Sequence, residues 1–148
     1  LIRSSFEDHF LSPTGKCYDL IISNPPYFVN SLRSEDPSKG LARHTDIVFF
    51  RNLITGTSAH LSPHGLLYLI LPLDTAELVR NLLSPTTGLV VKKTIFIHSF
   101  PESKPYRCIL VIGKGIQSSV VQKFVIYKTQ NNYTEEYRQL LKDYLTIF

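Results

Sequence analysis

The sequence is poor in cysteine, and its cysteines are not spaced for metal binding. The two that it has, Cys17 and Cys108, lie far apart and outside any Cys-x-x-Cys or cysteine–histidine motif. Zinc sites and disulfide-stapled folds need several such residues at short, defined spacings, so the pattern argues against both. We predict that both cysteines are buried as small apolar side chains in a protein of a reducing compartment.

Long apolar runs are also missing from the sequence. No segment reaches the roughly 18 consecutive apolar residues of a membrane span, and no basic stretch followed by an apolar one opens the chain. The sequence therefore predicts neither a membrane protein nor a secreted one, and we expect a cytoplasmic location.

Charged residues are scarce, at 19% of the chain, so neither a disordered acidic chain nor a highly basic tail is expected. The net charge of +4 is a mild basic excess that permits a polyanionic partner without requiring one. Apolar residues make up 43% of the 148 residues, which is enough to fill the core of one domain.

Methionine is absent, and the chain begins at Leu1 with residues that resemble the end of a strand and the loop after it. Neither an internal repeat nor a low-complexity linker divides the chain. We therefore expect residues 1–148 to form the C-terminal part of a single domain whose N-terminal part lies upstream.

Short apolar runs alternate with helical patterns along the chain. Strands are expected at 18–23, 66–71, 89–98, 106–113 and 120–128, and helices at 46–61, 74–83 and from 134 onward. Thr45 is the expected N-cap of the first helix, and Asp74 and Glu77 form a capping-box pair for the second. This order predicts an α/β sheet that finishes with an antiparallel hairpin. Ligands of open α/β sheets bind beyond the carboxyl ends of the strands, where the loop beginning at Asn24 lies.

The segment Asn24-Pro25-Pro26-Tyr27 follows the first of these strands and suits the chemistry of a planar amine. An exocyclic amine is a weak nucleophile because its lone pair is delocalised into the ring. The side-chain oxygen of Asn24 and the carbonyl oxygen of Pro25 could accept its two N–H bonds and favour a pyramidal nitrogen. Consecutive prolines restrict the backbone that presents these acceptors, and Tyr27 could stack on the base.

The same four residues could form a simple turn, because Asn-Pro and Pro-Pro are common turn dipeptides. The functional interpretation is favoured here because the segment directly follows an apolar strand at the ligand-binding edge of an α/β sheet.

In this motif the sequence resembles the Rossmann-like methyltransferases that act on planar amino groups. Its fuller pattern is similar to the bacterial enzymes that methylate N6 of an adenine in the anticodon loop of a valine tRNA. The resemblance rests on YDLIISNPPYF at 18–28, ARHT at 42–45 and NYTEEY at 132–137, which together span most of the chain.

The resemblance implies S-adenosylmethionine as the cofactor, tRNA as the partner and a Rossmann-like fold, while the spacing of cysteine and histidine predicts no metal. It makes Asn24, Pro25, Pro26 and Tyr27 the catalytic site for the target amine. It also makes Asp8 a contact to the adenine of the cofactor, with Asn24 beside the cofactor as well. The glycine-rich cofactor loop of the family is not found in these residues, so we expect the sheet to be incomplete at its N-terminal, cofactor-binding half.

Softer candidates for substrate binding surround this motif. The resemblance adds Phe28, and Arg43 and His44 could contact RNA phosphate, although a solvated pair at a helix start is an equal alternative. Phe100 could supply a second aromatic ring against a flipped base, or simply anchor its loop. A basic rim could form from Arg33, Lys39, Lys104 and Arg107.

Two alternatives to RNA adenine methylation remain open at the level of sequence. The same motif can serve a protein glutamine amide or the amino group of guanine, since both present a planar NH2 group. A methyltransferase-like module that binds RNA without catalysis is the alternative outside the enzymes.

If most of the cofactor site lies upstream, the 148-residue chain alone should show no measurable affinity for S-adenosylmethionine. Isothermal titration calorimetry of the isolated chain tests this expectation. A dissociation constant in the micromolar range would contradict it.

Overall fold

The computed structural model describes residues 3, 5–11, 15–25, 38–83, 85–116 and 120–146. At residues 6, 7, 11 and 38–46 only the backbone is described.

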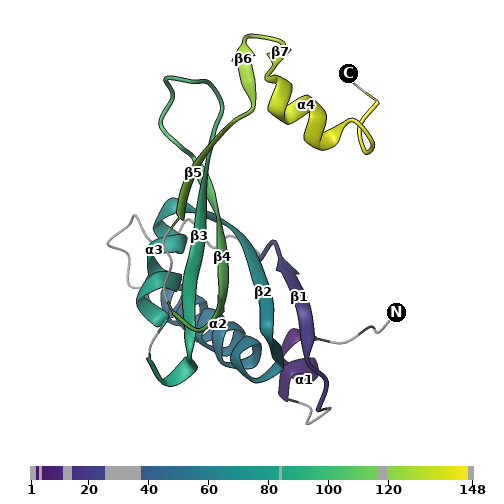
Figure 1. Cartoon of the computed structure of the whole chain (residues 1–148). Helices are drawn as coiled ribbons and strands as arrows, with labels where there is room; N and C mark the ends of the chain where they lie inside the picture. The colour runs from purple at the N-terminus through teal and green to yellow at the C-terminus, as the bar shows by residue number, and fades with distance from the viewer. Residues whose placement is uncertain are drawn as a thin grey trace.

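A mixed five-stranded sheet organises the molecule (Figure 1). Its strands are β1 (Tyr18–Ser23), β2 (Leu61–Pro72), β3 (Leu89–His98), β4 (Arg107–Lys114) and β5 (Val120–Val125). They lie in the order β1-β2-β4-β3-β5, with β1 parallel to β2, β3 parallel to β5, and β4 antiparallel to both of its neighbours. The predicted α/β class and the late antiparallel hairpin, which is β3–β4, are therefore confirmed. The carboxyl ends of β1, β2, β3 and β5 meet the amino end of β4 at one edge, called here the carboxyl edge.

Two helices cover one face of this sheet (Figure 1). The helix α2 (Ser38–His60) connects β1 to β2, and α3 (Leu73–Leu82) connects β2 to the short helix η2 (Pro85–Thr87) before β3. Phe50, Leu53 and Ile54 recur at helical spacing on α2 and are almost fully buried, so they form one apolar stripe.

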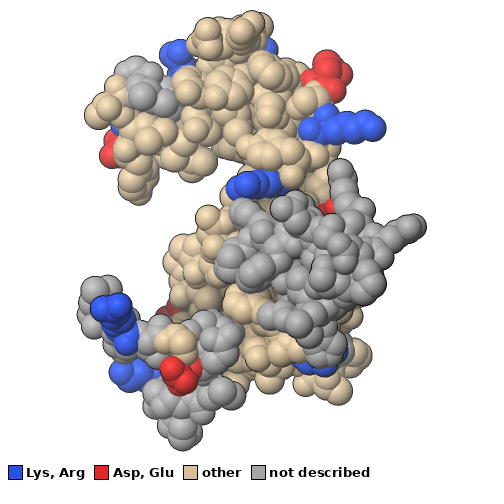
Figure 2. Space-filling model, turned by 180° about the vertical axis from the view of Figure 1, so that it is seen from behind, with Lys and Arg blue, Asp and Glu red and all other residues tan. Residues whose placement is uncertain are grey.

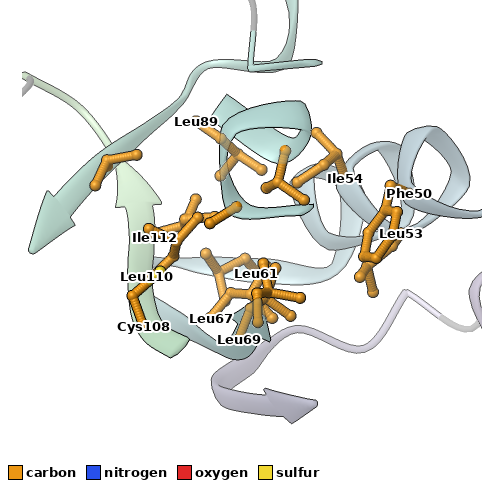
Figure 3. Packing of buried hydrophobic residues seen from close by; sticks show 14 residues of the cluster. Phe50, Leu53, Ile54, Leu61, Leu67, Leu69, Leu89, Cys108, Leu110 and Ile112 are labelled. Carbon is orange, nitrogen blue, oxygen red and sulfur yellow. The ribbon is translucent and has the colours of Figure 1, made fainter. Parts of the chain in front are cut away.

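Figure 3 shows these α2 side chains directed toward leucines of β2 and the apolar residues of β4. The core cluster comprises Phe50, Leu53, Ile54, Leu61, Leu67, Leu69, Leu71, Ala76, Val79, Leu89, Val91, Cys108, Leu110 and Ile112.

The other face of the sheet is also apolar but largely open among the described residues. On β1, Ile21 packs against the core, whereas the alternating Leu20 and Ile22 are 55% and 72% exposed. Farther along this face, a cavity of about 520 Å³ is bounded by Ile97 and Phe124 of the sheet and by Leu140 of α4 (Glu135–Leu141), among others. Figure 2 shows the molecule hollowed between the part at its top, which contains α4, and the part below it, which contains most of the sheet.

The upper lobe consists of the hairpin β6 (Tyr127–Thr129) and β7 (Asn132–Tyr133), followed by α4 (Figure 1). The predicted helix start near Thr134 is confirmed, because its hydroxyl oxygen accepts the N–H of Tyr137 at 3.2 Å as an N-cap. No residue of α4 is buried, so this helix lacks an apolar core of its own.

Several predicted boundaries were wrong. Helix α2 begins at Ser38, so Thr45 lies inside it and is not its N-cap. A helix that has nucleated gains one hydrogen bond for each added residue, and no proline interrupts the segment. Helix α3 follows Pro72, which makes no side-chain capping bond, so Asp74 does not open a capping box.

The segment Ser62-Pro63-His64-Gly65, which the predicted bounds left between a helix and a strand, belongs to β2 instead. The pairing with β1 shifts here, from Tyr18 opposite Leu61 to Leu20 opposite Leu66. A Cβ atom on Gly65 would lie 2.6 Å from the Tyr18 carbonyl oxygen, so this irregularity requires glycine. Residues 62–65, whose serine, proline and glycine are typical of loops, therefore form an irregular part of strand β2.

The helix α1 (Phe6–Leu11) was missed in the sequence. The hydroxyl oxygen of Ser5 accepts the N–H of Asp8 at 3.0 Å, which is an N-cap signal that the sequence did contain. The helix packs on α2 at Gly56, where an added Cβ atom would lie 2.8 Å from the Phe10 side chain.

Two buried threonines give opposite expectations for the same substitution. Among the described residues, Thr57 Oγ1 is buried and has no hydrogen-bond partner, whereas Thr94 Oγ1 accepts a bond from Arg80 Nη2. Replacing a buried, unpaired hydroxyl with a methyl group removes a desolvation cost. Thr57→Val should therefore raise the free energy of unfolding by about 1 kcal/mol, measured by urea denaturation.

The matched control is Thr94→Val, which should lower the free energy of unfolding because it takes an acceptor from Arg80. Equal effects of the two substitutions would contradict this account.

Candidate functional site

The carboxyl edge brings together the predicted catalytic motif and the loop between β3 and β4. Asn24 directly follows β1 and is exposed, and Pro25 beside it is buried. A buried proline with a fixed φ angle anchors the backbone, so the neighbouring carboxamide is held at the surface of this edge. Pro26, Tyr27 and Phe28 lie outside the described residues.

Arg43 and His44 lie within α2, not ahead of a helix as predicted. Their side chains are outside the described part of the chain. The backbone places both in the second turn of the helix that follows the motif loop. A contact to RNA by this pair stays a prediction.

Asp8 is not brought to the carboxyl edge. It lies exposed in the first turn of α1, and the next residue, His9, has its Nε2 atom 2.8 Å from the hydroxyl of Tyr18 at the start of β1. The six residues of β1 separate this point from Asn24, a distance of roughly 20 Å at about 3.3 Å per residue. Of the two predicted cofactor contacts, the structure therefore places Asn24 at the edge and Asp8 near the opposite end of β1.

Phe100 does lie at the carboxyl edge, in the loop that joins β3 to β4, and it is 39% exposed. Its N–H donates to Ser103 Oγ at 3.0 Å, and the Ser103 hydroxyl donates to its carbonyl oxygen at 2.9 Å. Of the predicted basic rim, Lys104 of this loop and Arg107 at the start of β4 also lie at this edge, whereas Arg33 and the side chain of Lys39 lie outside the described residues.

A ladder of aromatic rings links this loop to the upper lobe, and the sequence reasoning missed it. Its ring centroids are separated by 5.6 Å from Phe100 to Tyr127, 4.9 Å from Tyr127 to Tyr133, and 5.0 Å from Tyr133 to Tyr137. Phe124 adds a fifth ring, 6.2 Å from Tyr137. Hydrogen bonding with Tyr127, together with burial and the neighbouring phenols, raises the pKa of Tyr133. The dense aromatic content after residue 120 was the available signal.

The prediction that both cysteines are buried holds for Cys108 and fails for Cys17. Cys108 is buried as expected, and burial raises the pKa of its thiol, with the nearby charge of Arg80 acting in the opposite direction. Cys17 is exposed, so its prediction was wrong. Within the described ranges, no three His, Cys, Asp or Glu side chains gather as a metal site would require.

A second cavity, of about 580 Å³, lies at the opposite edge of the sheet. It is lined by Arg80 and by the start of β3 from Leu89 to Val91, among others. The start of β3 lies at the opposite end of the sheet from the carboxyl edge, so this cavity is separate from Asn24.

No family model matches the chain, but individual proteins do. Over 148 residues the chain is 36% identical to a Pedobacter heparinus protein named tRNA1(Val) (adenine(37)-N6)-methyltransferase, of which it covers 62%. Proteins of the same name from Phocaeicola vulgatus and Haemophilus influenzae are 35% and 31% identical over 92% and 100% of this chain. The matched regions cover 57% and 61% of those two proteins.

Among solved structures, the chain resembles a protein from Agrobacterium tumefaciens described as a predicted O-methyltransferase. The TM-score is 0.54 at 21% identity, over 84% of this chain and 51% of the other.

The sheet order and this structural likeness define the class of fold, which is a mixed α/β fold shared with that predicted O-methyltransferase. Within that class, the chain is homologous to bacterial proteins named tRNA1(Val) (adenine(37)-N6)-methyltransferase, so the resemblance stated from the sequence is confirmed. The chain spans about 60% of the length of these curated relatives. None of the described helices combines the length and the hydropathy that crossing a bilayer requires.

The burial of the two thiols predicts unequal reactivity. A raised pKa keeps the Cys108 thiol protonated at pH values where ordinary thiols begin to ionise, and burial also blocks access to it. Iodoacetamide at pH 8 should therefore label Cys17 at least about tenfold faster than Cys108 in the folded chain. Peptide mass spectrometry measures both rates. In urea the two should become similar, and equal rates in the folded chain would contradict the burial of Cys108.

Proposed function

We propose that the whole protein transfers a methyl group from S-adenosylmethionine to the N6 amine of an adenine in tRNA, within the cytoplasm. The observation that carries the proposal is the exposed Asn24 beside the buried Pro25, at the carboxyl edge of a methyltransferase fold. The names of the homologous proteins support both the reaction and the class of substrate.

The motif acts by holding the target amine. The Asn24 side-chain oxygen and the Pro25 carbonyl oxygen accept the two N–H bonds, which favours a pyramidal nitrogen whose lone pair points away from both acceptors. Because Pro25 is buried, these acceptors need little reorganisation when the base arrives. Tyr27 stacks on the base in this proposal, and Phe28 lies beside it. No strong general base is needed, since the amine becomes acidic only after the methyl group has been transferred.

S-adenosylmethionine, when bound, supplies the electrophilic methyl carbon for this reaction. Asn24 fits a position beside it, because the side chain is exposed at the edge where α/β sheets bind ligands. Asp8 lies in α1, next to His9, and its contact to the cofactor's adenine stays a prediction from the sequence resemblance. We assign the remaining cofactor contacts to parts of the whole protein that the chain does not span.

The acceptor could instead be a protein glutamine amide or the amino group of guanine, which are equally planar. RNA is favoured by the names of the homologous proteins and by the net charge of +4. Incubating the whole protein with labelled cofactor, in parallel with bulk tRNA and with release factors, separates these acceptors. Transfer to neither would favour a module that binds RNA without catalysis.

Asn24→Ala in the whole protein should lower kcat for tRNA methylation by at least about a hundredfold. That loss is typical when a pre-positioned hydrogen-bonding group at a transition state is removed. Affinity for S-adenosylmethionine, measured by calorimetry, should stay within a few-fold. The matched control is Asn52→Ala on the exposed side of α2, which should leave both quantities unchanged. Unchanged turnover in Asn24→Ala would refute the role given to this side chain.

A further inference from the structure

The loop between β3 and β4 is held in one shape although much of its surface is exposed. The Ser103 N–H donates to the Phe100 carbonyl oxygen at 3.1 Å, and His98 Nδ1 lies 2.6 Å from the Ser103 carbonyl oxygen. Lys123 Nζ donates to the Pro101 carbonyl oxygen from the neighbouring strand β5. A binding surface on this loop would lose little conformational entropy when a partner docks.

Two aromatic side chains project from this ordered loop with unusually high exposure. Phe100 is 39% exposed, and Tyr106, whose N–H donates to the Ile97 carbonyl oxygen at 3.1 Å, is 48% exposed. Lys104 lies between them and is exposed as well. Flat rings with nearby cations form the typical platform for unpaired nucleotides, because each base offers a π-face and each nucleotide a phosphate.

The hairpin β6–β7 begins against the same loop. Tyr127 N–H donates to the Ser99 carbonyl oxygen at 2.9 Å, and its ring contacts Phe100, so the start of β6 lies against the loop. Lys128 follows and is exposed. The backbone hydrogen bond of Tyr127, a second one from the Ile126 N–H to the His98 carbonyl oxygen at 3.0 Å, and the contact between the Phe100 and Tyr127 rings together hold the hairpin against the loop.

The charges of this region favour an anionic partner. At the carboxyl edge, the loop, the first residue of β4 and the β5–β7 segment carry the cations Lys104, Arg107, Lys123 and Lys128, against Glu102 in the loop and Glu135 and Glu136 in the first turn of α4. An acidic protein surface would match these charges, but it would not explain two exposed rings on the same loop as well as RNA does.

The distance from the catalytic motif separates this surface from the target base. Tyr106 immediately precedes β4, and Asn24 immediately follows β1, with β2 between the two strands. Two strand spacings of about 4.8 Å place their backbones roughly 10 Å apart along the edge. A base held by Asn24 therefore leaves Tyr106 to a neighbouring nucleotide.

We propose that Tyr106, Lys104 and Lys128 bind the nucleotides that flank the target adenine, with Tyr106 stacking on an unpaired base and the two lysines pairing with phosphates. The inference rests on the proposed function, because it takes RNA as the substrate. It assigns recognition of the flanking RNA to the β3–β4 loop and the β6–β7 hairpin.

Stacking by Tyr106 is tested in the whole protein with bulk tRNA as the substrate. Tyr106→Ala should raise KM about tenfold and leave kcat nearly unchanged, because a flanking base is bound equally in the ground state and the transition state. Tyr106→Phe keeps the ring and should restore KM. The control Tyr144→Ala removes a tyrosine that is 81% exposed near the chain end, and it should change neither parameter.

The phosphate contacts are tested by the salt dependence of tRNA binding. For each of Lys104→Ala and Lys128→Ala, the slope of log affinity against log salt concentration should become shallower by roughly 1. Arg51→Ala is the matched control, since it removes one exposed cation from α2, and its slope should equal that of the wild type.

The outcomes separate this inference from the proposed function. A wild-type protein that methylates no RNA would refute the proposed function before any variant is compared. A wild type that methylates tRNA, with Tyr106 and lysine variants that behave like their controls, would overturn the flanking-nucleotide surface and leave the proposed function standing.

Discussion

The burial of the apolar stripe of α2 against β2 and β4 is the constraint on which the rest of the molecule depends. Phe50, Leu53 and Ile54 are almost fully removed from solvent, and each such side chain contributes about 1.5–3 kcal/mol. Because α2 packs on the face of the sheet, it returns the chain from the end of β1 to the level where β1 began. The next strand, β2, therefore runs parallel to β1. The residue that follows β1, Asn24, is thereby left at the carboxyl edge and not in the core.

The same edge receives the later part of the chain because β4 returns antiparallel between β2 and β3. The β3–β4 loop therefore lies beside the carboxyl end of β2. Because β5 is parallel to β3, it ends at the same edge, and the upper lobe begins there. Hydrogen bonds within the loop and the aromatic ladder hold these pieces together without a second apolar core. The proposed amine site and the proposed RNA surface thus occupy one edge for a topological reason.

The two faces of the sheet differ in a way that bears on the whole protein. One face is sealed by α2 and α3, whereas Leu20 and Ile22 on the other are more than half exposed in the described chain. Strands of parallel sheets are normally covered on both faces, and the homologous proteins are longer than this chain.

The sequence by itself determined the features that depend on residues close together in the chain. The strands at 18–23 and 89–98, the cap at Thr134 and the exposed Asn24 beside a fixed proline follow from short-range apolar pattern, hydroxyl capping and ring geometry. The tertiary structure alone decided the start of α2, the bulged entry of β2 at Gly65, the exposure of Cys17 and the meeting of Phe100 with Tyr127. Those outcomes depend on contacts between residues far apart in the chain, whose free energies no local pattern encodes.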